Sequence, residues 1–221
     1  MDGYHPAVEE YLETILELEE SGIRPMRARI VERLGVSAPA VSETVRRLER
    51  EGYLTLDESR AIRLTTKGRH YATSIMRRHR LAERLLTDVM KVPWSQVHEE
   101  AGRLEHAISP RLEAHLVALL GDPGTCPHGN PIPGSVNAVD VASQVPLATA
   151  APGSTIVVRR IDEELEAQFD RMQELESIKV MPGRMLRVLG HEGPGQQRFD
   201  SDGEVITLDR MVTAKVYVTL E

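Results

Sequence analysis

The chain has 221 residues, of which 41% are hydrophobic and 28% charged, and it carries a net charge of −7. This length suits one large domain or two to three small ones with a real core, and the acidic balance argues against a generic nucleic-acid binder. The single cysteine, Cys126, excludes an intramolecular disulfide framework.

The sequence predicts a cytoplasmic protein. It contains no apolar run long enough to span a membrane. Its first residues, MDGYHPAVEEYL, lack the basic start and apolar centre of a signal peptide. A lone cysteine fits a reducing compartment.

The charge is unevenly distributed along the chain. Residues 24–80 contain 14 Lys and Arg against 6 Asp and Glu, a net of +8, whereas residues 1–23 carry a net of −7. A basic block between acidic segments can still face a phosphate backbone, so DNA binding remains open.

The first elements in chain order follow a recognisable sequence of types. Apolar residues at helical spacing predict helices over residues 6–20, 27–35 and 37–52, with Ser37 as an N-cap and Gly35 closing the second helix. Residues 53–65 alternate, break at a turn and alternate again, which predicts a hairpin. Helix, turn, helix and hairpin is the order of a winged helix-turn-helix.

The rest of the chain predicts more helices and then strands. Residues 66–90 have a long helical pattern, and residues 94–120 predict two helices, the second starting near Ser109-Pro110. Residues 121–135 are rich in Gly and Pro and predict a loop, and residues 136–153 carry few signals of order. From residue 154, short strands between turn residues predict a β-barrel of roughly 70 residues.

Several residues of the 37–52 helix and its surroundings are candidates for DNA contact. A recognition helix enters the major groove, where small side chains allow close approach, and arginines hold phosphates. The alternative is a three-helix unit that only packs, with its charges as a solvated face. The candidates are Arg27, Arg29, Ser37, Ala38, Pro39, Ala40, Ser42, Glu43, Arg47, Arg50 and wing residue Arg60.

Four pairs or triplets of residues have the spacing of metal ligands. Residues three, four or seven apart share a helix face, and imidazoles with carboxylates suit Mn, Fe, Co or Zn. The alternatives are a solvated acidic helix and a buried cysteine that only packs. Three sets have helical spacing: His98 with Glu105 and His106, His79 with Glu83, and Glu10 with Glu13; the fourth, Cys126 with His128, is two residues apart in a loop.

Several motifs together resemble the diphtheria toxin repressor family of metal-dependent regulators. They are RARIVERLG, VSETVRRLEREG, LTTKG, RRHRLAERLLTD, VHEEAGRLEH and GNPIPG, and they run over about residues 6–134, with a weaker match beyond. The resemblance implies a non-enzymatic repressor, mainly α with a small all-β domain, that binds double-stranded operator DNA as a homodimer. One or two dimers would occupy each operator, in the control of metal homeostasis.

The resemblance also implies three domains. They are a winged helix-turn-helix domain over residues 1–73, a helical dimerisation and metal-binding domain over 74–140, and a linker with an SH3-like (FeoA-like) domain over 141–221.

The family's two metal sites correspond to two sets of residues here. The primary site corresponds to Glu10, Gly102, Glu105 and His106, with Glu13 as a further carboxylate of manganese-type members. The ancillary site corresponds to His79, Glu83, His98, Cys126, His128 and either Asp162 or Glu163.

The primary set departs from the iron-type pattern at two positions. Iron-type members carry methionine and cysteine where this chain has Glu10 and Gly102, so a hard oxygen replaces sulfur and favours Mn(II). Fe(II) is the alternative, and Co(II), Ni(II) and Zn(II) are expected surrogates in vitro. Gly102 supplies no side chain; a water, Glu13, Glu99 or His98 would complete the site, unless the glycine serves only close helix packing.

The expected mechanism is a metal-dependent change of DNA affinity. Metal at the primary site would tie the N-terminal helix to the second domain and fix the angle between the winged helices of the dimer, at a coupling of roughly 1–3 kcal/mol. Two other classes remain open: a metal-dependent hydrolase, for which no HExxH motif is present, and a helix-turn-helix repressor that senses an organic ligand.

Overall fold

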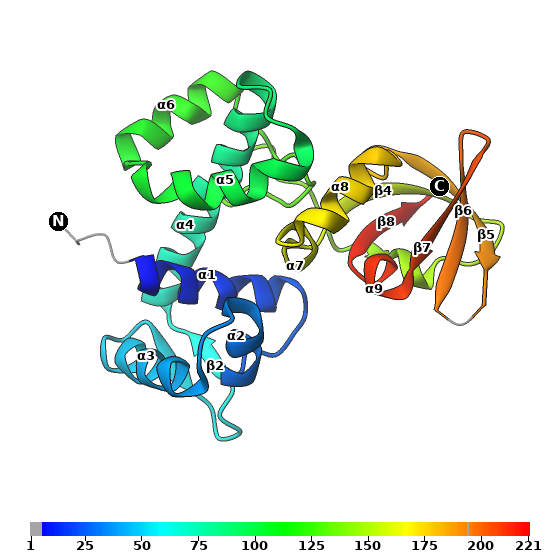
Figure 1. The fold of residues 1–221 in the computed structure, drawn as a ribbon. Helices are drawn as coiled ribbons and strands as arrows, with labels where there is room; N and C mark the ends of the chain where they lie inside the picture. Colours follow the sequence, from blue (N-terminus) through cyan, green and yellow to red (C-terminus); the bar gives the residue numbers. More distant parts are fainter. Residues whose placement is uncertain (1–5, 194) are drawn as a thin grey trace. The chain divides into compact units, whose positions relative to one another are not determined.

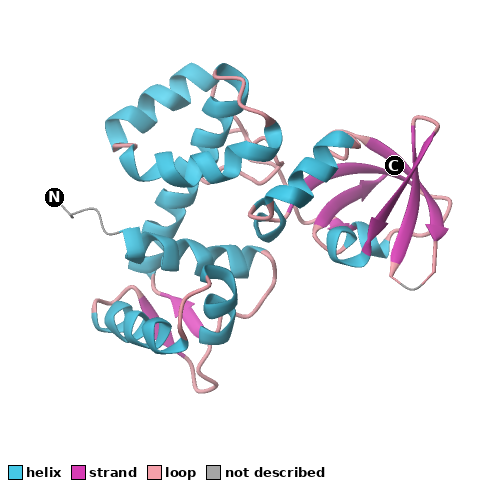
Figure 2. Ribbon diagram, viewed as in Figure 1, coloured by secondary structure: helices cyan, strands magenta, loops and turns pink. Residues whose placement is uncertain are grey.

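The computed structural model describes residues 6–193 and 195–221. The chain divides into two compact units. The first unit comprises Met1–His79 and Glu105–Ser109, and the second comprises Arg80–Leu104 and Pro110–Glu221. Figure 2 shows that helices dominate the N-terminal part of the chain and that most strands gather in the C-terminal part.

The first unit is a winged helix-turn-helix, as the sequence predicts (Figure 1). Strands β1 and β2 pair antiparallel in the register Leu54↔Leu64 and form the wing. The elements are α1 (Pro6–Glu20), α2 (Arg27–Leu34), α3 (Ala38–Arg50), β1 (Leu54–Leu56), β2 (Ile62–Leu64), the start of α4 (Thr66–Arg84) and the 3₁₀ turn η3 (Glu105–Ala107).

The helix ends of the first unit follow the expected local chemistry. The Ser37 hydroxyl accepts a hydrogen bond from the Ala40 amide at 3.4 Å and caps α3. Gly35 ends α2 in a left-handed conformation with φ +64°, which glycine adopts without steric cost. Both predicted boundaries are confirmed.

One core holds α1 together with α2, α3 and the wing. Leu12 and Ile15 of α1 are fully buried in the same cluster as Val41 and Val45 of α3 and Ile62 of the wing. A displacement of α1 would therefore reach α3 through this shared core, because interiors are close-packed.

The tip of the wing is organised by a single carboxylate. Asp57 Oδ1 accepts hydrogen bonds from the Ser59 hydroxyl at 2.6 Å, the Ser59 amide at 3.0 Å and the Ala61 amide at 2.9 Å. The hydrogen bond from the Ser59 hydroxyl is the main cause that lowers the pKa of Asp57 to about 2. The tip keeps Arg60 exposed in a left-handed conformation with φ +60°.

The second unit combines helices with an antiparallel sheet. Its sheet has the strand order β3-β8-β4-β5-β6-β7, and α8 contributes Met172 and Leu175 to the sheet's core. The elements are the end of α4, the π-helical turn η1 (Leu85–Val89), η2 (Trp94–Gln96), α5 (Val97–Leu104), α6 (Pro110–Leu120), β3 (Val145–Pro146), η4 (Leu147–Thr149), β4 (Thr155–Ile161), α7 (Glu163–Glu166), α8 (Phe169–Ser177), β5 (Met185–His191), β6 (Gln196–Ser201), β7 (Glu204–Asp209), α9 (Arg210–Thr213) and β8 (Val216–Leu220).

The predicted strands of this unit correspond to β4, β5, β7 and β8. The sequence does not predict β6, whose residues 196–201 are mostly polar, nor the short helices α7 and α8. Among the helices that the structure describes, none is both long and apolar enough to cross a bilayer.

Two helical glycines make a matched test of packing. A Cβ on Gly68, in the first turn of α4, would lie 1.8 Å from the Tyr53 carbonyl oxygen, whereas a Cβ on Gly102, in α5, would meet nothing within 4 Å. We expect Gly68→Ala to lower the free energy of unfolding by about 1–3 kcal/mol through overpacking. We expect Gly102→Ala to raise it by up to about 1 kcal/mol, because alanine favours helix over glycine. Thermal melts of both variants would check the opposite signs; equal shifts would contradict the prediction.

Candidate metal centres and DNA-binding face

The first unit contains a buried group of carboxylates and imidazoles, here called the first cluster. Its members come from three segments: Glu9 and Glu13 from α1, His79 from α4, and Glu105 and His106 from η3. His79 Nδ1 lies 2.6 Å from Glu105 Oε2 and 3.9 Å from Glu13 Oε1. His106 Nδ1 lies 2.6 Å from Glu9 Oε2, and its Nε2 lies 3.5 Å from Glu105 Oε1.

A tyrosine orients the α1 carboxylate of the first cluster. The Tyr71 hydroxyl donates to Glu9 Oε1 at 2.9 Å, which leaves Oε2 directed at His106. Burial, together with this hydrogen bond to Glu9, raises the pKa of Tyr71 to about 12, so the hydroxyl remains a donor. Glu9 and Glu13 are one helical turn apart and therefore share a face of α1.

The structure differs from the expectation for the primary set at Glu10. Glu10 lies on the exposed face of α1, and Glu9 takes the place beside His106, because the buried stripe of this helix includes Val8, Leu12 and Ile15. Gly102 is not required by close packing, since a Cβ there would meet open space. Of the residues proposed to complete the site, Glu13 lies in the first cluster, whereas Glu99 is exposed and pairs with Arg103.

The second unit contains another buried group, here called the second cluster. Its members come from four segments: Glu83 from α4, His98 from α5, Cys126 and His128 from the loop over residues 121–144, and Glu163 and Glu166 from α7. His98 Nδ1 lies 3.4 Å from Glu83 Oε1, 3.6 Å from Glu163 Oε2 and 3.3 Å from Glu166 Oε2.

The two carboxylates that α7 contributes to the second cluster are each held through one oxygen. Glu163 Oε1 accepts from Arg80 Nε at 3.0 Å and from Arg80 Nη2 at 2.9 Å, and Glu166 Oε1 accepts from Asn130 Nδ2 at 2.5 Å. Their Oε2 atoms face His98. Such outer hydrogen bonds are the usual means of fixing ligand carboxylates around a metal.

His128 is oriented in the same way. Its Nε2 lies 3.1 Å from the Trp94 carbonyl oxygen, which can only accept, so Nε2 carries the proton. Its Nδ1 lies 3.2 Å from Glu83 Oε1 and 2.9 Å from Glu166 Oε2. Both His128 Nδ1 and Glu166 Oε2 are buried without a hydrogen bond of proper geometry, which fits donors arranged for a cation.

The protonation of the second cluster reflects burial among negative charges. Burial raises the pKa of the Cys126 thiol to about 12, and the Glu83 carboxylate adds to this. Burial alone would lower the pKa of His128, but the carboxylates of Glu166 and Glu83 outweigh it and hold this pKa well above its ordinary value. Burial and the neighbouring Glu163 raise the pKa of Glu166. A divalent cation would relieve the repulsion among these carboxylates.

The loop that carries Cys126 and His128 is attached to strand β4. The Ile161 amide donates to the His128 carbonyl oxygen at 2.9 Å, and the Asn130 side chain donates to the Ile161 carbonyl oxygen at 2.9 Å. Gly129, with φ +92°, permits this contact, because a Cβ there would lie 1.9 Å from the Arg159 carbonyl oxygen. The attachment brings α7, which directly follows β4, next to the loop.

In the structure, residues of the predicted ancillary set occur in both clusters. His79 lies beside Glu105 and Glu13, while Glu83 lies with Cys126 and His128. Of the two acidic candidates from the third predicted domain, Glu163 faces the second cluster, whereas Asp162 caps α7 through the Glu164 amide. Glu9 and Glu166 are absent from the predicted sets; Glu166 stands three residues after Glu163, a spacing that places both on one face of a helix.

A concave face of the first unit gathers arginines from three elements. Arg27 of α2, Arg46 of α3 and Arg60 of the wing line one hollow together with Ser42 and Leu56. The start of α3 next to it, residues 37–40, is exposed throughout, as are Glu43 and Arg50. Of the other candidates, Arg29 is exposed and pairs with Glu32, and Arg47 is half-buried.

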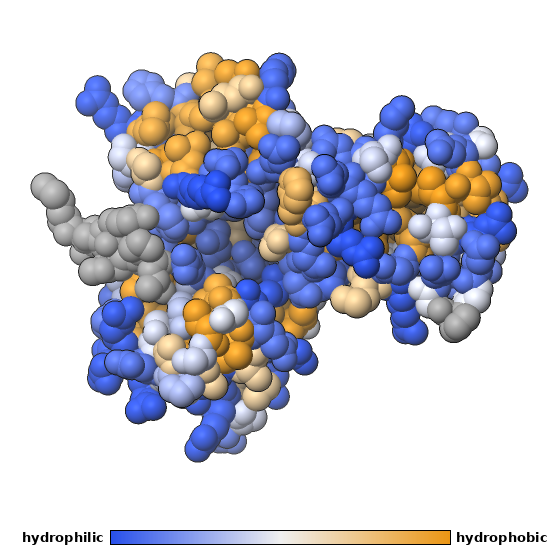
Figure 3. All heavy atoms as spheres, viewed as in Figure 1, coloured by the Kyte–Doolittle hydropathy of each residue, from blue (hydrophilic) through white to orange (hydrophobic). Residues whose placement is uncertain are grey.

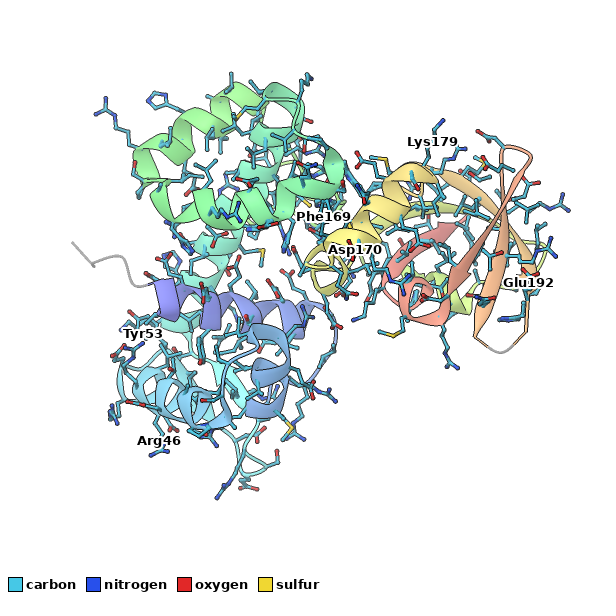
Figure 4. All side chains as sticks on the ribbon, viewed as in Figure 1. Arg46, Tyr53, Phe169, Asp170, Lys179 and Glu192 are labelled. Atoms are coloured by element: carbon cyan, nitrogen blue, oxygen red, sulfur yellow. The ribbon has the colours of Figure 1, made fainter. Side chains whose placement is uncertain are left out.

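Arg46 is absent from the predicted contacts but belongs to this face. It is exposed on the side of α3 that is turned away from α1 (Figure 4). Its Nε donates to the Ser42 carbonyl oxygen at 3.2 Å, which directs the guanidinium along the helix surface. Its position one turn after Ser42 would have indicated it from the sequence alone.

A winged helix-turn-helix with an arginine-lined face, in a chain that also carries two carboxylate–imidazole clusters, defines a metal-responsive DNA-binding protein. Comparisons with known proteins narrow this class. Residues 5–62 match the model of the iron dependent repressor N-terminal DNA binding domain, and residues 65–134 match that of the iron dependent repressor metal binding and dimerisation domain.

Two proteins that are similar in sequence are also repressors. The chain is 42% identical over 219 residues to the iron-dependent repressor IdeR of Mycobacterium tuberculosis, covering 95% of each chain. It is 41% identical over 193 residues to the diphtheria toxin repressor of Corynebacterium diphtheriae, covering 84% of this chain and 85% of that protein.

A solved structure of similar fold is also a transcriptional repressor. A manganese-dependent transcriptional repressor in complex with manganese has a TM-score of 0.85 at 33% identity, covering 97% of this chain and 100% of that one. The chain therefore belongs to the diphtheria toxin repressor family of metal-dependent transcriptional repressors, which are regulators and not enzymes.

Proposed function

We propose that this repressor responds to Mn(II) bound at the first cluster and controls metal homeostasis from the cytoplasm. The observation that carries the proposal is the donor set: all five members, Glu9, Glu13, His79, Glu105 and His106, offer carboxylate oxygen or imidazole nitrogen. Hard donors of this type suit Mn(II) better than softer metals. The manganese complex among the similar structures supports the same metal.

Fe(II) is the second candidate for the first cluster. The relatives at 41–42% identity are an iron-dependent repressor and the diphtheria toxin repressor, and imidazole with carboxylate also suits Fe(II). Co(II), Ni(II) and Zn(II) also bind imidazole and carboxylate donors, and they are expected to act as surrogates in vitro.

The first cluster is connected to the recognition helix α3 through the hydrophobic core that α1 and α3 share. Its ligands come from α1, α4 and η3, so a bound cation would fix these three segments to one another. Without the cation, the carboxylates Glu9, Glu13 and Glu105 repel one another. Because Leu12 and Ile15 of α1 pack in the same core as Val41 and Val45 of α3, fixing α1 restrains the recognition helix.

The second cluster is the candidate for a further metal ion. It offers a thiol, two imidazoles and three carboxylates, a set that accepts both hard and thiophilic cations. Its ligands come from the helical segment and from α7, so a cation would strengthen the attachment of the C-terminal sheet domain to the helices of the second unit.

The DNA face proposed here combines the predicted residues with Arg46. Arg27, Arg46 and Arg60 would hold phosphates, while the small residues at the start of α3 would allow the helix to approach base edges. Pro39 and Ala40 offer apolar contact to thymine methyl groups, and Glu43 can accept from cytosine N4.

The proposed homodimer would use the exposed apolar surface of the second unit. Leu112 and Leu119 of α6 are 44% and 63% exposed, and Figure 3 shows hydrophobic side chains gathered over this helix. Val89 and Met90 after α4 are also exposed. The family model that covers residues 65–134 describes a dimerisation domain, which supports this surface; one or two dimers would bind each operator.

The test is metal-dependent DNA binding. A duplex selected from a randomised library with Mn(II)-loaded protein would be labelled and titrated by fluorescence anisotropy at fixed salt, with Mn(II), Fe(II) or chelator present. We expect Mn(II) to raise the affinity by about 5–150-fold, the usual range of allosteric coupling. Arg46→Ala should weaken binding to all sequences and lower the salt slope by about one, whereas Arg111→Ala on α6 should not.

Two outcomes would contradict the proposal. Equal DNA affinity with Mn(II) and with chelator would remove metal control and leave a repressor that senses another ligand. A stronger response to Fe(II) than to Mn(II) under anaerobic conditions would assign the protein to iron.

A further inference from the structure

Glu176, in helix α8, makes its main contacts with the start of another helical segment, 81–82 residues earlier in the chain. Its Oε1 accepts from the Trp94 amide at 3.1 Å. Its Oε2 accepts from the Ser95 amide at 3.3 Å and from the Ser95 hydroxyl at 2.6 Å. These amides belong to η2, which leads directly into α5, so the carboxylate caps the N-terminal end of this segment, where a negative charge is favourable.

Trp94 connects this cap to the loop of the second cluster. Its indole nitrogen donates to the Pro127 carbonyl oxygen at 3.1 Å, and its own carbonyl oxygen accepts from His128 Nε2 at 3.1 Å. The two rings also pack, with centroids 4.7 Å apart. Trp94 is 5% exposed and belongs to the core of the C-terminal sheet, so its backbone has little freedom once Glu176 holds its amide.

The cap made by Glu176 affects two donors of the second cluster, His128 and His98. The Trp94 carbonyl keeps the proton on His128 Nε2 and so presents Nδ1 to Glu83 and Glu166. His98 lies in the first turn of α5, directly after the capped segment, and its position follows from where η2 begins. Glu176 therefore acts on both imidazoles through Trp94 and Ser95.

We propose that Glu176 is a positioning residue of the second metal centre, which sets the tautomer of His128 and the placement of His98 through its hydrogen bonds to Trp94 and Ser95. The proposal rests on the assignment of the second cluster as a metal site. It adds a residue from α8 to a centre whose donors come from α4, α5, the 121–144 loop and α7.

The test uses Co(II) as the probe, because coordination of the Cys126 thiolate gives a charge-transfer absorption that reports on this centre alone. Trp94 is the chain's single tryptophan, and its fluorescence provides a second readout beside His128. Full-length wild type would be titrated with Co(II) beside Glu176→Ala and Glu176→Gln. The matched control is Glu174→Gln, on the same helix, where the carboxylate is exposed and pairs with Arg171 at 3.0 Å.

We expect Glu176→Ala to weaken Co(II) binding at the second centre by about 10–100-fold and to alter the absorption spectrum, as loss of outer hydrogen bonds to metal ligands does. Glu176→Gln should show a smaller loss of the same kind, because it keeps one accepting oxygen; it also serves if the alanine variant folds poorly. Glu174→Gln should match wild type.

Wild-type affinity and spectrum in both Glu176 variants would overturn the proposal, and a lowered melting temperature with an unchanged spectrum would show a structural role only. If wild type gives neither thiolate-to-cobalt absorption nor a change in Trp94 fluorescence with Co(II), the second cluster is not a metal site, and the failure then lies with that assignment.

Discussion

Replacing Glu105 with glutamine is expected to abolish the response of DNA binding to Mn(II). Glu105 is 2% exposed and stands at the centre of the first cluster, with Oε2 2.6 Å from His79 Nδ1 and Oε1 3.5 Å from His106 Nε2. Glutamine has the same shape, but it removes a negative charge and places an amide group where a cation needs an oxygen donor. At saturating Mn(II) for wild type, the DNA affinity of the variant should fall by the full coupling factor of about 5–150-fold.

Anisotropy of the selected duplex at fixed salt, with and without Mn(II), would measure this loss. Glu100→Gln is the matched control, because Glu100 is exposed on α5 and pairs with Arg103 at 2.6 Å. It removes the same charge without touching the cluster and should keep the wild-type response. A Glu105→Gln variant that still responds to Mn(II), while Cys126→Ser does not, would transfer the sensing role to the second cluster.

The sequence predicts the local structure around both clusters better than it predicts which donors meet. Caps and turns depend on neighbouring residues, so Ser37, Gly35 and the wing hairpin follow from the sequence alone. Glu9 and Glu10 illustrate the limit: they stand four and three residues before Glu13, so either could share its face. Packing of α1 and the hydroxyl of Tyr71, far along the chain, decide for Glu9.

The second cluster shows the same limit over longer distances. Glu166 lies on a helix of only four residues, too short to give a periodic pattern, and the sequence therefore reveals Glu163 without its neighbour. The cap that Glu176 makes for η2 spans 82 residues of sequence at its Trp94 contact, and no local rule relates the two. Short motifs indicate that metal ligands are present, whereas the tertiary contacts select and orient them.

Cation affinity at the second cluster is expected to rise steeply with pH. In the metal-free protein the pKa of His128 is held well above its ordinary value by Glu166 and Glu83, against the opposing effect of burial, and burial raises the pKa of Cys126 to about 12. Near neutral pH both donors therefore carry protons that a coordinated cation must displace. Each displaced proton changes the affinity by about tenfold per pH unit, so coordination by both gives about 100-fold per unit.

These two pKa values determine the direction of the pH dependence of cation affinity and the pH range over which it extends. Acidification adds protons that compete with the cation, so affinity decreases as the pH decreases. The contribution of His128 ends as pH rises through its elevated pKa, while the contribution of the thiol continues up to a pH of about 12. Co(II) titrations across about pH 6–8, followed by thiolate absorption, would measure the slope directly.

The Cys126→Ser variant distinguishes the proton released by the thiol from the proton released by His128. A hydroxyl does not ionise in this range, so the slope should fall to about tenfold per pH unit, with His128 as the remaining proton donor. Titration of the wild-type protein with Mn(II) gives an independent comparison. If this harder cation binds without the thiolate, its affinity should change per pH unit as much as the affinity of the serine variant for Co(II) does. A flat profile for both metals would mean that neither Cys126 nor His128 coordinates the ion, and that the carboxylates of Glu83, Glu163 and Glu166 hold it with His98.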